Sequence, residues 1–159
     1  MDYNLIKDII CKVLEDEQID DKVLLLVYGD LFGYFVERDK LLKDSLIKNQ
    51  YLILIRKLKV EFERYNINVY KLIDKTGECY LSFTPGVYGG NKKLKIYGKL
   101  NCSSANRWIE KGYYVSNRVF FKDEETAIEA GYRPCAVCMP NEYSVWKVNQ
   151  EKVLSLKRD

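Results

Sequence analysis

Apolar residues recur at helical spacing in two stretches of the first half of the chain. Within residues 3–17 the stripe consists of Leu5, Ile6, Ile9, Ile10, Val13 and Leu14. Within residues 40–65 it consists of Leu42, Leu46, Leu54, Leu58 and Phe62, with charged residues between them. Spacings of three and four residues place side chains on one face of an α-helix. We therefore predict one helix in 3–17 and one long helix in 40–65.

Two features of this half are less regular. Cys11 lies beside the first apolar stripe, so we expect its side chain to pack rather than to react. The interval 23–36 is apolar and fits either a helix or a strand, because Gly29 and Gly33 weaken both interpretations.

After residue 66 the period changes from helical to alternating. Residues 69–73 and 79–83 are β-prone and flank the sequence Asp-Lys-Thr-Gly-Glu, which predicts a β-hairpin with Cys79 in a strand. Turn-forming residues then fill positions 84–91, the strongest interruption in the chain. We place a domain boundary there and predict two domains, 1–83 and 84–159.

The second half contains shorter elements. Residues 94–97 and 118–122 predict short strands. A helix is expected between Asp123, a suitable N-cap, and Gly131, a suitable C-terminal stop. A last helix is expected from about Pro140 to Leu156, with Tyr143, Trp146, Val153 and Leu154 as packing residues. The fold class is thus α+β: a helical N-terminal region with a hairpin, then a small α+β domain with a short antiparallel sheet.

The composition is that of a soluble globular protein, with 47% hydrophobic and 31% charged residues among 159. No segment approaches the roughly 18 apolar residues of a membrane span, and the first residues lack the cationic and apolar regions of a signal peptide. We therefore expect a cytoplasmic protein without a membrane partner. Its five cysteines, an odd number in a reducing compartment, argue against a disulfide framework.

The chain contains no histidine. This excludes serine-histidine and cysteine-histidine catalysis, and it removes the commonest nitrogen ligand of zinc. Any zinc site must therefore use sulfur, carboxylate or water.

Positive charge is concentrated in one block. Residues 91–122 contain eight basic residues and one acidic residue, a net charge of +7, whereas the whole chain carries +3. Aromatic residues are interleaved with them: Tyr97, Trp108, Tyr113, Tyr114, Phe120 and Phe121. This composition is typical of a surface that meets phosphates and bases. The alternative is a solvated face whose aromatic side chains turn inward to the core.

Three cysteines of the second half have the spacing of a metal site. Cys135 and Cys138 form a C-x-x-C turn, which places two sulfurs on one side of a tight bend, and Pro134 stiffens the approach. Cys102 precedes them at a distance. The alternative is that these thiols are only small buried side chains.

The run from Lys95 through Cys138 resembles the metal-binding domain of Ada, the bacterial adaptive-response protein that repairs methyl phosphotriesters in DNA. The resemblance is carried by Cys102-Ser103-Ser104, Asn117-Arg118-Val119-Phe120-Phe121 and residues 125–138, which end in Gly-Tyr-Arg-Pro-Cys-Ala-Val-Cys. It does not extend into the N-terminal half.

In that family four cysteines hold zinc, a C-x3-C pair followed by a C-x2-C pair, and one thiolate of the first pair accepts the methyl group. The resemblance implies that Cys135 and Cys138 are the second pair and that Cys102 is the second member of the first. Its partner's position is occupied by Gly98, so the acceptor thiolate is missing. Asp123 and Cys79 are candidates for a fourth ligand. In an alternative register Cys102 is the acceptor, and Asn106 stands where the second cysteine belongs.

We therefore predict a domain that binds zinc through Cys102, Cys135 and Cys138 and has lost methyl transfer. Weak, non-specific binding to nucleic acid, DNA in particular, is assigned to six basic residues: Lys92, Lys93, Lys95, Lys99, Arg107 and Arg118. The pattern identifies no partner for residues 1–83.

Enzymatic alternatives remain beside this prediction, although a binding domain is favoured. They are a methyl acceptor in DNA methyl-phosphotriester repair that uses Cys102, and a hydrolase that uses an open zinc position. A thiol redox module is disfavoured because a helix, not a strand, precedes the C-x-x-C motif. A zinc deaminase is excluded because no cysteine ligand is followed two residues later by glutamate.

Overall fold

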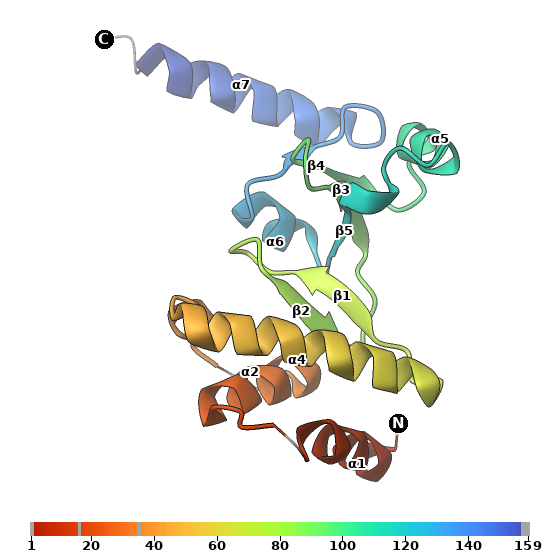
Figure 1. Cartoon of the computed structure of the whole chain (residues 1–159). Coiled ribbons are helices and arrows are strands. Elements are labelled where there is room, and N and C mark those ends of the chain that lie inside the picture. The colour runs from red at the N-terminus through yellow and green to blue at the C-terminus, as the bar shows by residue number, and fades with distance from the viewer. Residues whose placement is uncertain (1, 16, 35, 157–159) are drawn as a thin grey trace. The chain divides into compact units, whose positions relative to one another are not determined.

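The computed structural model describes residues 2–15, 17–34 and 36–156. The chain divides into two compact units, Met1–Lys71 with Cys79–Pro85, and Leu72–Glu78 with Gly86–Asp159. The elements up to the hairpin are α1 (Tyr3–Leu14), α2 (Asp21–Phe32), α3 (Arg38–Leu41), α4 (Ser45–Arg64), β1 (Tyr70–Ile73) and β2 (Cys79–Ser82) (Figure 1). The strands β1 and β2 form the predicted hairpin, and Cys79 is a strand residue as predicted.

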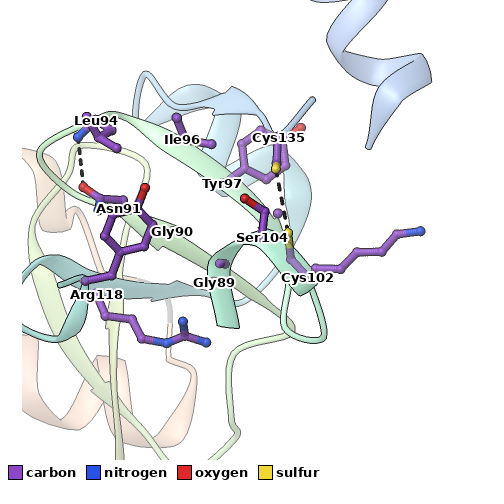
Figure 2. A pocket seen from close by; sticks show the side chains of 14 residues that line it. Gly89, Gly90, Asn91, Leu94, Ile96, Tyr97, Cys102, Ser104, Arg118 and Cys135 are labelled. Atoms are coloured by element: carbon purple, nitrogen blue, oxygen red, sulfur yellow. Dashed lines mark hydrogen bonds between the residues drawn. The ribbon is translucent and has the colours of Figure 1, made fainter. Parts of the chain in front are cut away.

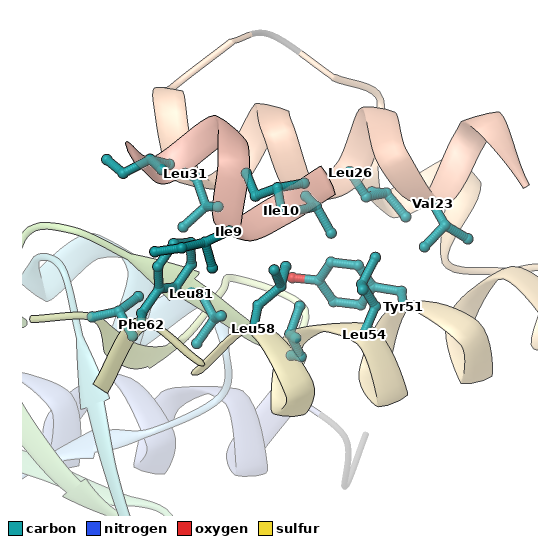
Figure 3. Close-up of a cluster of buried hydrophobic side chains, with 14 of the residues drawn as sticks. Ile9, Ile10, Val23, Leu26, Leu31, Tyr51, Leu54, Leu58, Phe62 and Leu81 are labelled. Carbon is teal, nitrogen blue, oxygen red and sulfur yellow. The ribbon is translucent and has the colours of Figure 1, made fainter. Parts of the chain in front are cut away.

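The core of the first unit lies between its helices. Side chains of α1 and α2 meet those of α4, and Leu81 of β2 joins them (Figure 3). Leu58 and Phe62 on α4 are completely buried, as are Ile6 and Ile10 on α1. The ambiguous interval 23–36 therefore contains a helix, α2, which ends where Gly33 adopts a left-handed conformation with φ 71°.

Two predictions for this unit were wrong. The single long helix of 40–65 is divided into α3 and α4, because Asp44 has extended backbone and accepts the N–H groups of Leu46 and Ile47 as the N-cap of α4. Cys11 was expected to pack, but its side chain is exposed. It follows Ile10 along α1 and so faces away from the buried stripe.

A buried polar network crosses the core of the first unit. The guanidinium of Arg38 donates to the Asp30 carboxylate, to the Tyr51 hydroxyl at 3.2 Å and to the Cys79 carbonyl at 2.9 Å. Tyr51 also donates to Asp30. The network joins α2, α3 and α4 to β2, so it stabilises the arrangement of these elements.

The second unit is built on a four-stranded sheet in the order β5-β3-β4-β6. Its strands are β3 (Tyr88–Asn91), β4 (Ile96–Lys99), β5 (Arg118–Phe121) and β6 (Arg133–Pro134). All pairs are antiparallel except β4 with β6. The predicted strand in 94–97 begins two residues later, and the one in 118–122 is confirmed as β5.

The inner strand β3 falls inside the segment that was interpreted as a domain-boundary turn, so that interpretation missed a strand. Glycines are poor strand formers, but here they permit close packing. A Cβ added to Gly90 would come within 2.9 Å of the Phe121 ring and 3.0 Å of the Ile96 carbonyl oxygen. Larger residues would push the neighbouring strands apart.

Three helices complete this unit, α5 (Ser103–Glu110), α6 (Glu124–Glu129) and α7 (Pro140–Leu156), with a short 3-10 turn at Val115–Asn117. The helix α6 is confirmed, with Asp123 accepting the Thr126 N–H at its start and Gly131 at φ 81° after its end. The helix α5 was not predicted. Among the described residues, no helix has both the length and the apolar character needed to span a membrane.

The predicted α7 is confirmed, but its packing was only partly anticipated. Tyr143 and Trp146 are half-buried, and the guanidinium of Arg133 lies over both rings in cation–π contacts. Val153 is exposed, and the side chain of Leu154 lies outside the described residues. Among the described side chains, those that anchor this helix to its unit therefore lie in its first half.

Candidate metal centre

The three cysteines of the second half converge on one point. The sulfur atoms of Cys102, Cys135 and Cys138 all lie within 4.8 Å of one another. The Sγ atoms of Cys102 and Cys135 are 3.9 Å apart, too far for a disulfide bond, and all three thiols are free. The structure thus brings together residues that are separated by more than thirty positions in sequence.

Local backbone structure positions each sulfur. Cys102 is the N-cap residue of α5, and its N–H donates to the Lys99 carbonyl at the end of β4. Cys135 directly follows β6, and its N–H donates to the Tyr97 carbonyl at 2.8 Å, which continues the pairing with β4. Cys138 is held by the tight turn in which Met139, itself buried, donates to the Cys135 carbonyl. The strand β4 therefore provides the common support for all three ligands.

Backbone N–H groups point at two of the sulfurs. Burial acts to raise the pKa of the Cys135 thiol, but the N–H groups of Cys138 and Val137 and the neighbouring thiols outweigh it and lower the pKa. Burial raises the pKa of Cys138 to about 12, against the N–H of Lys99, which donates to its Sγ at 3.4 Å. Proximity of Cys102 and Cys135 adds to that rise. Three thiols so close together cannot all ionise unless a cation lies among them.

This donor set fits a thiolate-binding metal. A tetrahedral site with Zn–S bonds of about 2.3 Å has sulfurs about 3.8 Å apart, and the observed 3.9 Å between Cys102 and Cys135 agrees with it. The N–H donors stabilise the deprotonated form that a metal requires.

Gly98 lies directly against this cluster. A Cβ added there would be 2.7 Å from the Cys138 sulfur and 3.0 Å from the Cys135 Cβ. Position 98 therefore adjoins the sulfurs, yet it contributes no donor atom. This agrees with the register in which Gly98 replaces the first cysteine of a C-x3-C pair.

A pocket of about 100 Å³ opens beside the sulfurs. Cys102 and Cys135 line it together with Gly89, Gly98 and Arg118. Figure 2 shows the two cysteines facing each other at one side of the pocket and Arg118 at the other. This pocket was not predicted from the sequence, because Gly89 was interpreted as a turn residue and not as part of a strand.

The family comparison agrees with this geometry. The family model described as the metal binding domain of Ada matches residues 82–141. Residues 82–141 are therefore similar to an Ada-type metal-binding domain. The match includes the whole sheet and the three cysteines, while residues 1–81 lie outside it. No curated protein and no solved structure matches the chain.

The candidate fourth ligand within this unit, Asp123, was wrong. Within the described part of the chain, the cysteine cluster includes no carboxylate and no other thiol. The Asp123 carboxylate caps α6 and accepts hydrogen bonds from both the N–H and the hydroxyl of Thr126. Cys79 lies in β2, within the first unit. Among the described residues of this unit, three ligands converge and no fourth joins them.

The basic residues assigned to nucleic acid come from several elements of the domain. Lys92, Lys93 and Lys95 occupy the turn between β3 and β4, Lys99 ends β4, Arg107 is on α5 and Arg118 starts β5. All are exposed except Arg118, which is half-buried. Lys95 is also engaged within the domain, because its ammonium lies 4.3 Å from the centre of the Tyr132 ring.

The aromatic residues of the basic block divide into two groups. Tyr97 and Phe121 are buried in the core, at 1% and 0% exposure. Trp108 and Tyr113 remain 41% and 65% exposed, and their rings contact each other edge to face. Lys111 places its ammonium 5.5 Å from the Trp108 ring. The alternative of inward-facing aromatic side chains therefore holds for Tyr97 and Phe121 but not for Trp108 and Tyr113.

Proposed function

We propose that residues 84–159 form a domain that holds one Zn²⁺ through Cys102, Cys135 and Cys138, binds DNA weakly and without sequence specificity, and accepts no methyl group. The observation that carries the proposal is the convergence of three sulfurs within 4.8 Å beside a glycine. Three thiolates are a strong zinc-binding set, and zinc bound there stabilises the fold that brings them together. Since the thiols must stay reduced, we place the protein in the cytoplasm.

The metal is tested on protein purified without chelators. We expect one zinc per chain by elemental analysis, and loss of the metal in Cys135→Ser. Cys11→Ser is the matched control, because Cys11 is exposed on α1 and belongs to no cluster of ligands among the described residues. A normally folded protein without stoichiometric metal would exclude the zinc site.

The domain's basic surface supports the nucleic-acid part of the proposal. Its net charge of +7 over residues 91–122 favours phosphate contacts, which release counterions and so weaken as salt rises. Trp108 and Tyr113 add exposed rings on which bases can stack. Neither feature distinguishes one base from another, so we expect binding without sequence specificity.

Binding is measured by anisotropy of a labelled DNA duplex over a series of salt concentrations. We expect affinity to fall steeply with salt, and to be lost when Lys92, Lys93 and Arg107 become glutamate together. Lys95 is left unchanged because of its contact with Tyr132. The control makes the same charge change at Lys7, Lys22 and Lys43, exposed residues of the first unit. If both variants lost affinity for DNA equally, binding would depend on the overall charge of the chain and not on this basic surface.

Two observations support the absence of methyl transfer. Gly98 stands where the family's acceptor thiolate belongs, and Cys102 is only 3% exposed. An acceptor thiolate has to reach a phosphotriester on the DNA backbone, which a buried thiol does poorly. We expect no gain of a methyl group by intact mass after incubation with an oligonucleotide that carries a methyl phosphotriester. A gain that Cys102→Ser abolishes would establish the alternative register.

A further inference from the structure

The three sulfurs leave the metal one donor short. Zinc bound by protein ligands is almost always four-coordinate, and a site with three protein ligands accepts a fourth from outside the chain. Two carboxylates of this unit are engaged elsewhere, Asp123 with Thr126 and Glu124 with the Tyr97 hydroxyl at 2.7 Å. No residue in the described part of the chain completes the set.

The pocket adjoins the cluster, because Cys102, Cys135 and Gly98 line it. Gly89 and Gly98 are directly opposite in the pairing of β3 with β4, so their missing side chains would share one face of the sheet. A Cβ at Gly98 would touch the cysteine cluster, and a Cβ at Gly89 would lie 3.5 Å from the Arg118 guanidinium. Opposed Cβ positions are about 5 Å apart. The sulfurs and the guanidinium therefore lie on the same face, close enough for one small molecule to reach both.

Arg118 lacks a counter-ion in this pocket. Within the described residues no carboxylate forms an ion pair with it, and its guanidinium lies 5.1 Å from the centre of the Phe120 ring. Burial lowers the pKa of Arg118, as expected for a cation removed from water without a partner. A bound carboxylate would satisfy it with paired hydrogen bonds.

We propose that the metal of this domain takes its fourth ligand from a small thiol that also carries a carboxylate, bound in the pocket between the sulfurs and Arg118. The thiolate supplies a donor like the three already present, and the carboxylate pairs with Arg118. The pocket, at about 100 Å³, suits a molecule of a few non-hydrogen atoms. This inference rests on the proposed metal site and adds a ligand class to it.

The test uses the full chain loaded with Co²⁺, whose visible absorption reports the number and kind of its ligands. The reductant is a phosphine, so that no thiol is present at the start. Addition of 3-mercaptopropionate should change the Co²⁺ spectrum and saturate at one molecule per metal. Arg118→Gln should weaken this binding about tenfold or more, since it removes a charge-assisted pair.

A second probe separates the role of Arg118 from a general loss of structure. The probe 2-mercaptoethanol has the thiol but no carboxylate, so it should bind the parent and Arg118→Gln equally. Gly98→Cys supplies a fourth sulfur from the chain and should abolish the response to both probes, provided that the Cys138 sulfur moves aside. Arg118→Gln leaves the ligands intact, so its result stands even if Gly98→Cys does not fold.

The outcomes distinguish the two proposals. Failure to bind stoichiometric Co²⁺ or Zn²⁺ would overturn the proposed function and this inference with it. Stoichiometric metal with a spectrum that neither thiol changes would overturn the inference alone. A four-sulfur spectrum before any thiol is added would also overturn it, because a cysteine of the chain would then fill the position. If Arg118→Gln weakened the binding of both probes equally, Arg118 would not recognise the carboxylate, and that part of the proposal would be wrong.

Discussion

The two units of this protein are organised around different kinds of centre. The first contains an extended cluster of buried apolar side chains on three helices and a strand, with Leu58 and Phe62 of α4 fully buried. The second has strands of no more than four residues and a smaller set of buried apolar side chains around Tyr97 and Phe121. It also contains the three converging cysteines. The helical unit can be stabilised by hydrophobic burial alone, whereas the sheet unit resembles small domains that need a metal.

This comparison indicates which interactions stabilise each unit. Hydrophobic burial is insensitive to a chelator, but thiolate ligands without a metal repel one another and release the segments that carry them. The three predictions that follow test this contrast, each with a variant that acts in one unit only.

Removal of the metal should have the largest effect, and only in the second unit. Cys135→Ser, or a chelator, should destabilise that unit by roughly 5 kcal/mol or more, because the binding energy of a structural metal is folding energy. Hydrogen exchange should show lost protection in β3, β4 and β5, with α4 unchanged. Equal loss of protection in α4 would contradict the contrast between the units.

A cavity in the helical core should give the second largest effect. Leu58→Ala should lower the free energy of unfolding of the first unit by about 2–5 kcal/mol, since Leu58 is 0% exposed. The matched control on the same helix is Ile53→Ala at 51% exposure, which should change it by less than about 0.5 kcal/mol. Denaturation followed by circular dichroism measures both. Metal content should be unchanged in the two variants, and its loss in Leu58→Ala would show that the first unit supports the metal centre.

The smallest effect should come from the cap of α6. Asp123→Ala removes the acceptor for Thr126 and should destabilise the second unit by about 1 kcal/mol. The pKa of Asp123 is lowered in the folded protein: burial acts to raise it, but the hydrogen bonds from Thr126 and the charge of Lys122 outweigh that. Because the folded pKa is depressed, the ionised Asp123 carboxylate stabilises the fold at pH values above the unfolded pKa of about 3.9. This stabilisation is lost as the pH falls through the folded pKa.

The measurement for Asp123 is therefore a pair of unfolding curves, one near neutral pH and one in acid. The difference between the parent and Asp123→Ala should shrink on acidification. A difference that is the same at both pH values would show that the carboxylate charge contributes nothing to the cap.

Much of the helical unit could be predicted from the sequence. The apolar period of α1 and most of α4 is long and regular, and period alone determines which face of a helix is buried. The break at Asp44 was missed because the apolar stripe continues across it, and only the cap geometry reveals the new start. In the second unit β3 was missed because its two glycines resemble a turn, although neighbouring strands require them there.

By itself the sequence determined the chemical inventory of the site: three thiols in a basic half, no histidine, and a glycine in place of a fourth cysteine. Residue types and short spacings suffice for this, because a C-x-x-C turn is a local structure. Only the tertiary structure decided that Cys102 joins the turn, that Asp123 does not, and that Gly98 and Arg118 line one pocket. These facts depend on how β4 pairs with β3 and β6, and contacts between strands distant in sequence leave no local pattern from which they can be predicted.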